Sequence, residues 1–314
     1  MINDIIAPSD APVLVIGAAG MDMVGRLKSD LRPHTSNPAQ IRYTFGGAAR
    51  NVAENLLHLG TNVTLMTVVG TDETGENLIR AISEAGGKVE VIKSVKYPTG
   101  TYLAVINADG KLEYGLDDMR ALNELSPKYI HAHEGLFEQA SLLFIDANLS
   151  KETLRTVMSI AHRSKLPVCA DPTSESLASK LSPYLQRLQL LVPNRGEAAI
   201  LCHRSGVNTR REAIDAAKCL VTQGVEIAIV TMTESDICYA TSETSGYVPP
   251  VRTNIIDPTG AGDALTAGVL FGLLNQMPID DAVRLGVAAE SLTLAYRGAV
   301  VPDLTLEKLY DQLG

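Results

Sequence analysis

The sequence predicts an α/β protein built on one central, mostly parallel β-sheet with helices on both sides. Short aliphatic and β-branched runs alternate with longer amphipathic stretches along almost the whole chain. Strands that alternate with helices are joined by right-handed crossovers, which place helices on both faces of a single sheet. The 314 residues contain no repeat, no low-complexity tract and no linker. We therefore expect one domain over residues 1–314.

The composition indicates an ordinary globular protein and leaves an anionic small substrate possible. Hydrophobic residues make up 46% of the chain and charged residues 20%, a balance typical of folded soluble domains. The net charge of −9 argues against nucleic acid or an anionic membrane as partner. No apolar run approaches the ~20 residues that span a bilayer, and no signal-peptide pattern opens the chain. Four single cysteines lack metal-ligand spacing, and we expect a cytoplasmic protein.

The chain opens with a buried strand. Val13–Ile16 is a continuous aliphatic run, typical of a strand covered on both faces. We expect the residues after it to place Asp22 in a crevice at the edge of the sheet, where open α/β sheets bind their ligands. Gly17 and Gly20 provide half of a dinucleotide fingerprint, but no third glycine follows at the right place and no helix opens there. A dinucleotide-dependent oxidoreductase is therefore the weaker alternative.

A second strand and a glycine-led helix follow. Ile41–Phe45 alternates between apolar and polar residues, which indicates an exposed strand. Gly46 and Gly47 open a helix with apolar residues at helical spacing, and Gly60 ends it. Asn51 lies one turn into this helix. Because asparagine is a poor helix former, we expect it to have a polar role near the glycines.

A strand, a helix and another strand come next, and a predicted hairpin then interrupts the alternation of strands and helices. We expect a strand over 63–69, a helix over 74–85 and a strand over 89–92. Apolar runs over 101–106 and 111–114 then flank an Asp-Gly turn signal, which predicts an antiparallel hairpin. We expect segments near 36–45 and 99–119 to form a small β lid that covers a site and excludes water. The hairpin could pair with the strand over 41–45, and an edge extension of the main sheet is the alternative.

After the hairpin the strand–helix alternation resumes. We expect strands over 142–145, 167–170, 190–192, 227–230 and 237–240, the last antiparallel. We expect helices over 151–162, 210–223, 280–296 and 304–313, and one that runs from the 257–263 loop to about 274. Polar residues stand where three of these strands end: Asp146, Asp171 and Asn194. Any one of them could be a turn residue. Since the carboxyl ends of parallel strands meet at one edge of a sheet, we expect them to surround a ligand together.

The most informative stretch runs from Asp257 to Asp263, with the sequence Asp-Pro-Thr-Gly-Ala-Gly-Asp, and leads into an apolar helix. Glycines let an anion approach the backbone closely, and the first turn of a helix presents unpaired N–H groups at the positive end of its dipole. Asp263 stands beside this loop, where a carboxylate can orient an attacking hydroxyl. Taken alone, the stretch could also be a tight turn capped by aspartate.

Three motifs occur in a fixed order: Gly46-Gly47 followed by Asn51, then Asn194-x-x-Glu197, then the 257–263 loop. This set closely resembles the ribokinase-like (phosphofructokinase-B, PfkB) carbohydrate kinase family over nearly the whole chain. The resemblance implies a three-layer α/β fold with a small β lid, and transfer of phosphate from ATP, with Mg²⁺, to a primary hydroxyl. Paired hydroxyl contacts to a buried carboxylate would discriminate a ribosyl acceptor from sugars that lack those hydroxyls.

Within that family, several stretches are most similar to those of pseudouridine kinases: Ser36-Asn37-Pro38, the segment 46–51, Asp118-Met119, Asp146-x-Asn148 and Thr253-Asn254. This finer likeness implies the 5′-hydroxyl of pseudouridine as acceptor. Ribose, another nucleoside or a ketohexose are the alternatives within the family. A non-catalytic ligand sensor on a kinase scaffold is the alternative from another class.

The resemblance also implies a role for each motif residue. Asp263 is the catalytic base, and the N–H groups of Gly260, Ala261 and Gly262 form the anion hole. The expected acceptor-binding residues are Asp22, Gly46, Gly47, Asn51, Asp118 and Asn148. The expected cofactor-binding residues are Asn194, Glu197, Thr231 and Thr259. Asn194 and Glu197 hold Mg²⁺ through water, and Asp257 borders a monovalent-cation site for K⁺. We expect the helix N-terminus to keep the pKa of Asp263 low.

One segment departs from the family pattern. The family has T-x-G-x-x-G beside the nucleotide, whereas this chain has Thr231-Met232-Thr233-Glu234-Ser235-Asp236, with Thr233 and Asp236 in place of the glycines. Extra acidic side chains could repel a triphosphate. This segment leaves three explanations open: a shifted loop, a different phosphoryl donor, or weak nucleotide binding. The lid strands could also pair between two subunits and form a homodimer.

Overall fold

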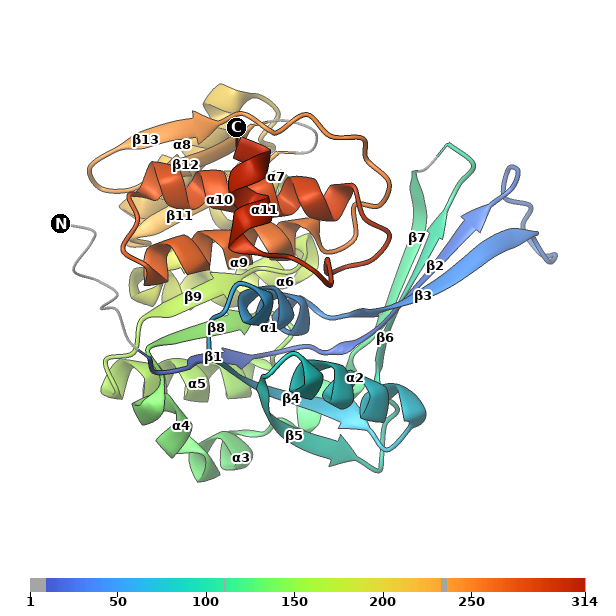
Figure 1. Ribbon diagram of the computed structural model, residues 1–314, viewed down its shortest axis with the longest axis horizontal. Coiled ribbons are helices and arrows are strands. Elements are labelled where there is room, and N and C mark those ends of the chain that lie inside the picture. The colour runs from blue at the N-terminus through green and yellow to red at the C-terminus, as the bar shows by residue number, and fades with distance from the viewer. Residues whose placement is uncertain (1–9, 110, 233–235, 314) are drawn as a thin grey trace.

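The computed structural model describes residues 10–109, 111–232 and 236–313. Over these residues the strands form two sheets: a nine-stranded sheet in the body of the molecule and a four-stranded sheet that projects from it (Figure 1). Helices cover both faces of the large sheet. The architecture is the expected three-layer α/β fold, and the smaller sheet is the expected lid.

The large sheet is parallel except at one edge. Its strands, in spatial order, are β13 (Ser245–Val248), β12 (Ile237–Ala240), β11 (Ile227–Thr231), β10 (Leu190–Leu191), β9 (Val168–Asp171), β8 (Leu142–Asp146), β1 (Val13–Ile16), β4 (Val63–Gly70) and β5 (Lys88–Ser94). Only the β11–β12 and β12–β13 pairs among these strands are antiparallel. Val15 of β1 pairs with Leu65 on one side and Phe144 on the other. The aliphatic runs thus form the buried centre of the sheet, as predicted.

Two groups of helices pack against opposite faces of this sheet. On one face lie α1 (Ala48–His58), α9 (Ala261–Leu274) and α10 (Ile279–Leu294), and on the other lie α5 (Lys151–Arg163), α7 (Arg195–Leu201) and α8 (Arg210–Thr222). Alternate residues of β1 divide the core: Val13 and Val15 face the first group, and Leu14 and Ile16 face the second. The two faces follow from the two-residue period of a strand.

The remaining helices are short or peripheral. They are α2 (Glu73–Glu84), α3 (Pro127–Ala132), α4 (Glu134–Gln139), α6 (Glu175–Ala178) and α11 (Leu306–Leu313), with 3₁₀ helices η2 (Arg120–Glu124) and η3 (Ser179–Arg187). Among the helices that the structure describes, none combines the length and the apolar character that crossing a membrane requires.

The lid sheet contains a strand that the sequence did not predict. Its order is β3 (Ala39–Gly46), β2 (Gly20–Leu27), β6 (Gly100–Ile106) and β7 (Leu112–Asp118). The predicted exposed strand is β3 and the predicted hairpin is β6–β7. However, β2 lies between them, so the expected pairing of the hairpin with β3 is wrong. Asp22 accordingly lies inside a strand and not after one. Gly20 and Gly25 weaken the strand signal of β2, which explains why it was missed.

A buried aspartate joins the body to the lid. The Oδ2 atom of Asp146, at the end of β8, accepts hydrogen bonds from the backbone N–H of Ala18 (2.7 Å) and of Ala49 (3.2 Å). Its Oδ1 atom accepts one from the N–H of Asn148 (2.9 Å). These contacts fix the segment between β1 and β2, the start of α1 and the loop after β8. Asp146 therefore has a structural role at the edge of the sheet where the strands end.

Candidate active site

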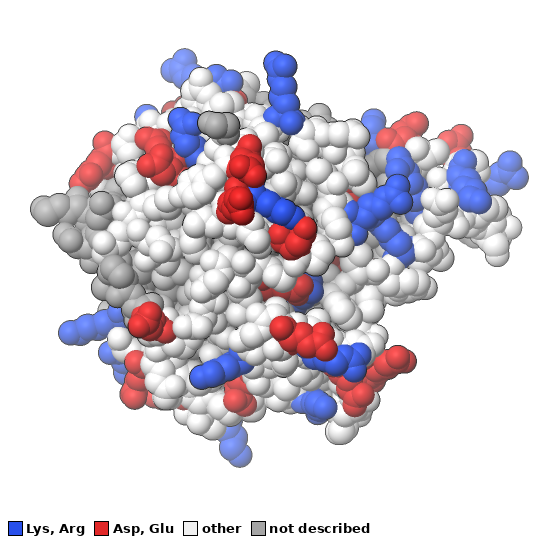
Figure 2. Space-filling view, viewed as in Figure 1, with Lys and Arg blue, Asp and Glu red and all other residues white. Residues whose placement is uncertain are grey.

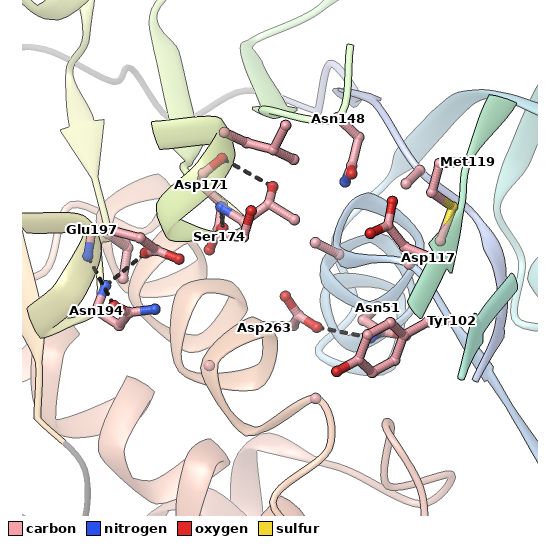
Figure 3. Close-up of a pocket in the computed structure, with 18 of the residues that line it drawn as sticks. Asn51, Tyr102, Asp117, Met119, Asn148, Asp171, Ser174, Asn194, Glu197 and Asp263 are labelled. Carbon is pink, nitrogen blue, oxygen red and sulfur yellow. Dashed lines mark hydrogen bonds between the residues drawn. The ribbon is translucent and has the colours of Figure 1, made fainter. Parts of the chain in front are cut away.

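A cavity of about 500 Å³ lies between the lid, the loops after the central strands and the start of α9 (Figure 3). Pockets of this size at the carboxyl ends of parallel strands commonly bind small ligands. The predicted site residues that line it are Asp22, Gly47, Asn51, Asn148, Asn194, Glu197, Thr231, Gly260, Gly262 and Asp263. Those that do not line it are Gly46, Asp118, Asp257, Thr259 and Ala261.

Asp263 stands in the middle of this cavity (Figure 3). On one side, the lid end, lie Asp22, Tyr102 and Asp117. On the other side, the α7 end, lie Asp171, Asn194, Glu197 and Thr231. The structure thus brings residues from both halves of the chain around one carboxylate.

The loop before α9 has the geometry expected of an anion site. Gly260 is the N-cap of α9 and has a left-handed φ of 75°. A Cβ atom there would overlap the carbonyl oxygen of Ala299, so the position requires glycine. Gly262 lies in the first turn with no atom within 4 Å of where its Cβ would be. The first-turn N–H groups of a helix lack intrahelical partners, and its dipole favours an anion.

Asp263 is held by a chain of hydrogen bonds. Its Oδ2 atom accepts a hydrogen bond from Nδ2 of Asn51 at 2.7 Å. The Oδ1 atom of Asn51 in turn accepts one from Nη1 of Arg50 at 2.9 Å. Arg50 is only 4% exposed, forms an ion pair with Glu54 and donates to the carbonyl of Phe45. Since Arg50 occupies the amide oxygen of Asn51, the amide nitrogen faces Asp263.

The environment of Asp263 differs from the sequence-based expectation. Burial raises the pKa of Asp263 well above its usual value, and the negative charge of Asp171 raises it further, against the effect of the Asn51 hydrogen bond. The expected low pKa is therefore wrong. The N-terminus of α9 favours the carboxylate, but loss of solvent and nearby negative charge outweigh it. A raised pKa makes a carboxylate a better proton acceptor.

The register of the lid sheet aligns three polar side chains over the cavity. Asp22 on β2 pairs with Tyr102 on β6, which pairs with Asp117 on β7. Directly paired residues share one face of a sheet, and all three line the cavity. The absence of a side chain at Gly46 makes room for the Asp22 carboxylate, which a Cβ atom there would overlap. Gly47 has a φ of 93°, which favours glycine.

Asp22 is a buried carboxylate that ionises near neutral pH. It is 8% exposed, and burial raises its pKa to about 6, against the lowering effect of Arg50. The charge of Asp257 adds a smaller rise. Above that pH the carboxylate can accept hydrogen bonds from two hydroxyl groups.

Asp118 does not face the cavity, contrary to the prediction. Its carboxylate accepts hydrogen bonds from Nε and Nη2 of Arg120 at 2.8 and 2.6 Å. Side chains alternate between the faces of a strand, so the preceding Asp117 lines the cavity instead, together with Met119 just after β7. The sequence contains two adjacent aspartates, and only the register of the hairpin decides which one faces inward.

Asn194 and Glu197 form a capping box at the start of α7. Oδ1 of Asn194 accepts hydrogen bonds from the N–H groups of Gly196 (2.9 Å) and Glu197 (3.0 Å), and Oε2 of Glu197 accepts one from the N–H of Asn194 (2.8 Å). The motif therefore stabilises the helix as well as lining the cavity. Thr231 is joined to Asn194 by a parallel bridge between their backbones.

Carboxyl groups with raised pKa values gather at the α7 end. Burial raises the pKa of Glu197 to about 8, and the carboxylates of Asp171 and Glu175 add to the rise. Burial likewise raises the pKa of Asp171 to about 7, and Asp146 adds to it. Over residues 10–109, 111–232 and 236–313, Asp171 and Glu197, which line the cavity, and their neighbour Glu175 have no ion-pair partner.

The α7 end fits a divalent cation held through water. Within the described part of the chain, no three His, Cys, Asp or Glu side chains are grouped as direct metal ligands. Mg²⁺ prefers carboxylate and carbonyl oxygens and usually keeps several of its waters. The oxygens of Asn194, Glu197 and Asp171 satisfy that preference, and a cation there would favour the ionised forms of the two carboxyl groups.

Three residues of the 257–263 loop do not line the cavity: Asp257, Thr259 and Ala261. The N–H and hydroxyl of Thr259 donate to Oδ1 of Asp257 at 3.1 and 2.8 Å, so Thr259 is not turned toward a cofactor as expected. The N–H of Ala261 is directed to the carbonyl of Pro258 (3.3 Å). Oδ2 of Asp257 lies 2.6 Å from Nη2 of Arg42. A K⁺ ion next to that oxygen does not fit, because a guanidinium is already there.

The segment that departs from the family pattern is only partly described. Thr233 and Glu234 lie outside the described residues. Asp236 is 8% exposed, and its Oδ2 accepts a hydrogen bond from Nε of Arg210 at 2.5 Å. Arg210 also lies over the ring of Tyr247, 4.0 Å from its centroid. The charge of Asp236 is thus paired with Arg210, and its presence does not argue against a nucleotide.

Several lining residues were not among the predicted site residues, namely Tyr102, Asp117, Met119, Thr173 and Ser174. Of the three strand-end residues expected around a ligand, Asp171 and Asn194 line the cavity and Asp146 does not. Thr173 and Ser174 follow β9, so their place after a parallel strand was the available signal. Tyr102 and Asp117 belong to the hairpin that was expected to cover the site. Their inward orientation follows from pairing with β2, which the sequence did not reveal.

Comparison with known proteins identifies the family. A family model described as pfkB family carbohydrate kinase matches residues 10–306. The chain belongs to the pfkB family. This pfkB-family kinase is 31% identical to the pseudouridine kinase of Escherichia coli K12 over 300 residues, which cover 94% of each chain. It is 29% identical to the guanosine-inosine kinase of Exiguobacterium acetylicum, over 93% of this chain and 97% of that one.

Solved structures agree with this assignment. The pfkB-family kinase superimposes on the ribokinase of Arabidopsis thaliana in complex with ribose and ATP with a TM-score of 0.82 and 18% identity, over 96% and 98% of the two chains. The predicted ribokinase-like fold is confirmed. Ribokinase-like kinases use ATP and Mg²⁺, and a solved Escherichia coli neighbour is bound to both. The protein is accordingly a phosphotransferase of the family that acts on sugars and nucleosides.

Proposed function

We propose that the protein transfers the γ-phosphate of ATP to the 5′-hydroxyl of pseudouridine. The observation that carries this proposal is the position of Asp263 at the start of α9, between a lid end that suits a ribosyl group and an α7 end that suits a nucleotide with Mg²⁺. The similarity to pseudouridine kinase over 94% of both chains supports the choice of acceptor.

In the proposed reaction, Asp263 accepts the proton of the 5′-hydroxyl as its oxygen bonds to the γ-phosphorus. The bond from that phosphorus to the bridging oxygen breaks, and ADP leaves. The N–H groups of Gly260 and Gly262 stabilise the charge on the migrating phosphoryl oxygens. Mg²⁺, when bound, neutralises the phosphates. Asn194 and Glu197 orient its waters, and Thr231 borders the nucleotide.

The lid end recognises the ribosyl group in this proposal. Asp22 accepts hydrogen bonds from two ribose hydroxyls, and Asn51 and the backbone of Gly47 complete the contacts. An acceptor that lacks a hydroxyl would leave the buried Asp22 carboxylate unpaired, which strongly disfavours its binding. The hydrogen-bond chain from Arg50 keeps Asn51 oriented when the acceptor is absent.

The nucleobase contacts follow from the chemistry of a C-nucleoside. Pseudouridine is linked through carbon, so both ring nitrogens carry N–H groups, whereas uridine has only one. Asp117 is an acceptor when ionised and matches the additional N–H, and the amide of Asn148 matches a neighbouring carbonyl and N–H. Tyr102 and Met119 provide apolar surface for the ring.

A panel of acceptors tests the proposal. Pseudouridine, uridine, guanosine, ribose and fructose are each assayed with ATP and Mg²⁺, and kcat/KM is compared. We expect pseudouridine to have the highest value, with uridine as the matched control because it differs only in the glycosidic link. A higher value for guanosine would favour the guanosine-inosine kinase relationship, and one for ribose or fructose would favour a sugar kinase.

A ligand sensor is the alternative from another class. It predicts that no acceptor gains phosphate although nucleosides still raise the melting temperature of the protein. Thermal shift measured on the same panel separates the two readings, because a kinase shows both binding and turnover.

We also propose that the outer face of the lid pairs with a second copy of the chain. Opposite the row of Asp22 and Tyr102, this face presents Tyr43 and Leu116, each 60% exposed, and Ile41 and Tyr114, 59% and 56% exposed. Contiguous exposed apolar surface of this kind marks an interaction site. Sedimentation should show a dimer, and Leu116→Glu should shift it to a monomer; a wild-type monomer would contradict the proposal.

A further inference from the structure

An ion pair connects the edge of the lid to the loop before α9. Nη2 of Arg42 on β3 lies 2.6 Å from Oδ2 of Asp257. The two residues are far apart in sequence, and β3 is an edge strand of the lid sheet. Figure 2 shows several Lys and Arg side chains over the lid and its junction with the body. Arg42 differs from an ordinary surface cation because its partner is almost completely buried.

Asp257 anchors the loop that forms the anion hole. It is 1% exposed. Its Oδ1 accepts both hydrogen bonds from Thr259, and its backbone N–H donates to the carbonyl of Leu294 at 3.2 Å. Asp257 thus fixes the chain just before Gly260, whose left-handed conformation begins α9. A change at Asp257 would therefore displace the first turn that contains Asp263.

The second oxygen of Asp257 requires a positive charge. Among the described residues, Oδ2 receives no hydrogen bond, so its contact with Arg42 is an ion pair. A buried carboxylate without a partner is strongly unfavourable. The charge of Asp257 also reaches the lid end of the cavity, because it contributes to the raised pKa of Asp22. Without Arg42, the charge of Asp257 would add to the negative charge of Asp22 at the lid end.

We propose that Arg42 is the resident cation of Asp257 and a positioning residue for the anion hole. In this arrangement the guanidinium takes the place of the K⁺ ion that the family resemblance implied. The reaction then needs no monovalent cation, and the lid must be in contact with the body for the loop to be held. For its catalytic consequence this inference rests on the proposed kinase activity.

Cation dependence of three variants tests the proposal. Wild type, Arg42→Ala and Arg42→Lys are assayed in KCl and in tetramethylammonium chloride at equal ionic strength, since tetramethylammonium is too bulky to enter the site. Wild-type rates should be nearly the same in the two salts, because equal ionic strength gives equal general screening. Arg42→Ala should lose roughly tenfold or more in tetramethylammonium, since breaking a buried ion pair is strongly unfavourable. K⁺ or guanidinium should restore most of the loss.

A control variant separates this effect from a general effect of lid charge. Arg26 on β2 is exposed and lies on the same face of the lid sheet as Arg42. It pairs with Gln40, which lies two residues before Arg42 on β3. Arg26→Ala should behave like wild type in both salts. Arg42→Lys should keep most of the wild-type activity in both salts, because it retains the charge.

A second measurement does not depend on catalysis. The melting temperature of Arg42→Ala should rise more in KCl than in tetramethylammonium chloride, because an ion that binds only the folded state stabilises it. Wild type should show no such difference. Strong K⁺ activation of wild type, or an Arg42→Ala variant with no K⁺-specific response in either assay, would overturn the proposal. If no acceptor is phosphorylated, the kinase proposal fails, and the melting temperatures still decide the role of Arg42.

Discussion

The two ends of the cavity balance their buried negative charge in different ways. At the lid end, Asp22 lies in the field of Arg50, and Asp257 behind it is paired with Arg42. At the α7 end, burial raises the pKa of Asp171 to about 7 and that of Glu197 to about 8, and within the described residues neither has an ion-pair partner. The acids of the lid end therefore have cations supplied by the chain, whereas Asp171 and Glu197 at the α7 end are free to take up a cation from solution. From this difference we infer that the proposed acceptor site is preformed and that the proposed nucleotide site depends on Mg²⁺.

The largest effect is expected where the two ends meet. Asp263→Asn removes the proton acceptor while keeping the size of the side chain. We expect kcat to fall by about 10²–10⁴-fold, the usual contribution of a general base, with little change in KM. Steady-state kinetics with pseudouridine and ATP measure both constants.

Asp118→Asn is the matched control for this variant. Asp118 is paired with Arg120 and lies outside the cavity, so its replacement should leave kcat near the wild-type value. Near-normal turnover by Asp263→Asn would remove Asp263 from its proposed role.

The next effect concerns the cation of the lid end. Arg50→Met leaves Asn51 without its hydrogen-bond donor and Asp22 without a nearby positive charge. Because Arg50 lowers the pKa of Asp22, its removal should raise that pKa and move the acid limb of kcat/KM to higher pH. A purely structural defect would instead lower activity equally at every pH. Arg50→Lys keeps the charge and should leave the limb near its wild-type position.

A smaller effect is expected at the α7 end. Glu197→Gln retains the capping box, since glutamine also serves at that position of the helix, but it removes one negative charge from the proposed Mg²⁺ site. The Mg²⁺ concentration for half-maximal rate should rise by roughly tenfold, as for other residues that act through a metal's outer ligands. KM for the acceptor should not change. A selective rise in acceptor KM would show that Glu197 acts on the acceptor and not on Mg²⁺.

The smallest effect is the pH dependence of acceptor binding. Asp22 has a pKa of about 6, so its carboxylate is charged above that pH and becomes neutral as the pH falls through it. Acceptor affinity should therefore weaken below about pH 6 and stay level above it. Calorimetric titration with pseudouridine between pH 5 and pH 8 measures this. Asp22→Asn should bind weakly at every pH; an unchanged pH profile in that variant would assign the titration to another group.

The sequence predicted the parts of the fold that depend on local patterns. The aliphatic runs of β1 and β4 could only be buried strands, and the glycines before α1 and α9 marked sharp changes of direction. The order of the three motifs predicted the cavity, because each lies where a strand or a loop ends at the same edge of the sheet. These features need no knowledge of distant contacts.

The remaining features depend on tertiary structure. Gly20 and Gly25 weaken the strand pattern of β2, so the sequence did not predict this strand. Without β2, the register of the lid sheet could not be used to infer that Asp117 faces inward and Asp118 outward. The pKa of Asp263, in the first turn of α9, depends on burial and on Asp171, which lies at the end of β9. The pairing of Arg42 with Asp257 joins opposite ends of the chain, and neither residue by itself indicates the other.

The most direct test of phosphate transfer across this cavity is the ³¹P NMR spectrum of the product formed from pseudouridine, ATP and Mg²⁺. A phosphate on the 5′-oxygen is coupled to the two protons of the 5′-carbon with similar coupling constants and gives a triplet. We expect that triplet to grow as ATP is converted to ADP with wild-type protein. A doublet, which indicates a secondary hydroxyl, or release of inorganic phosphate without a nucleotide product, would contradict the proposed reaction.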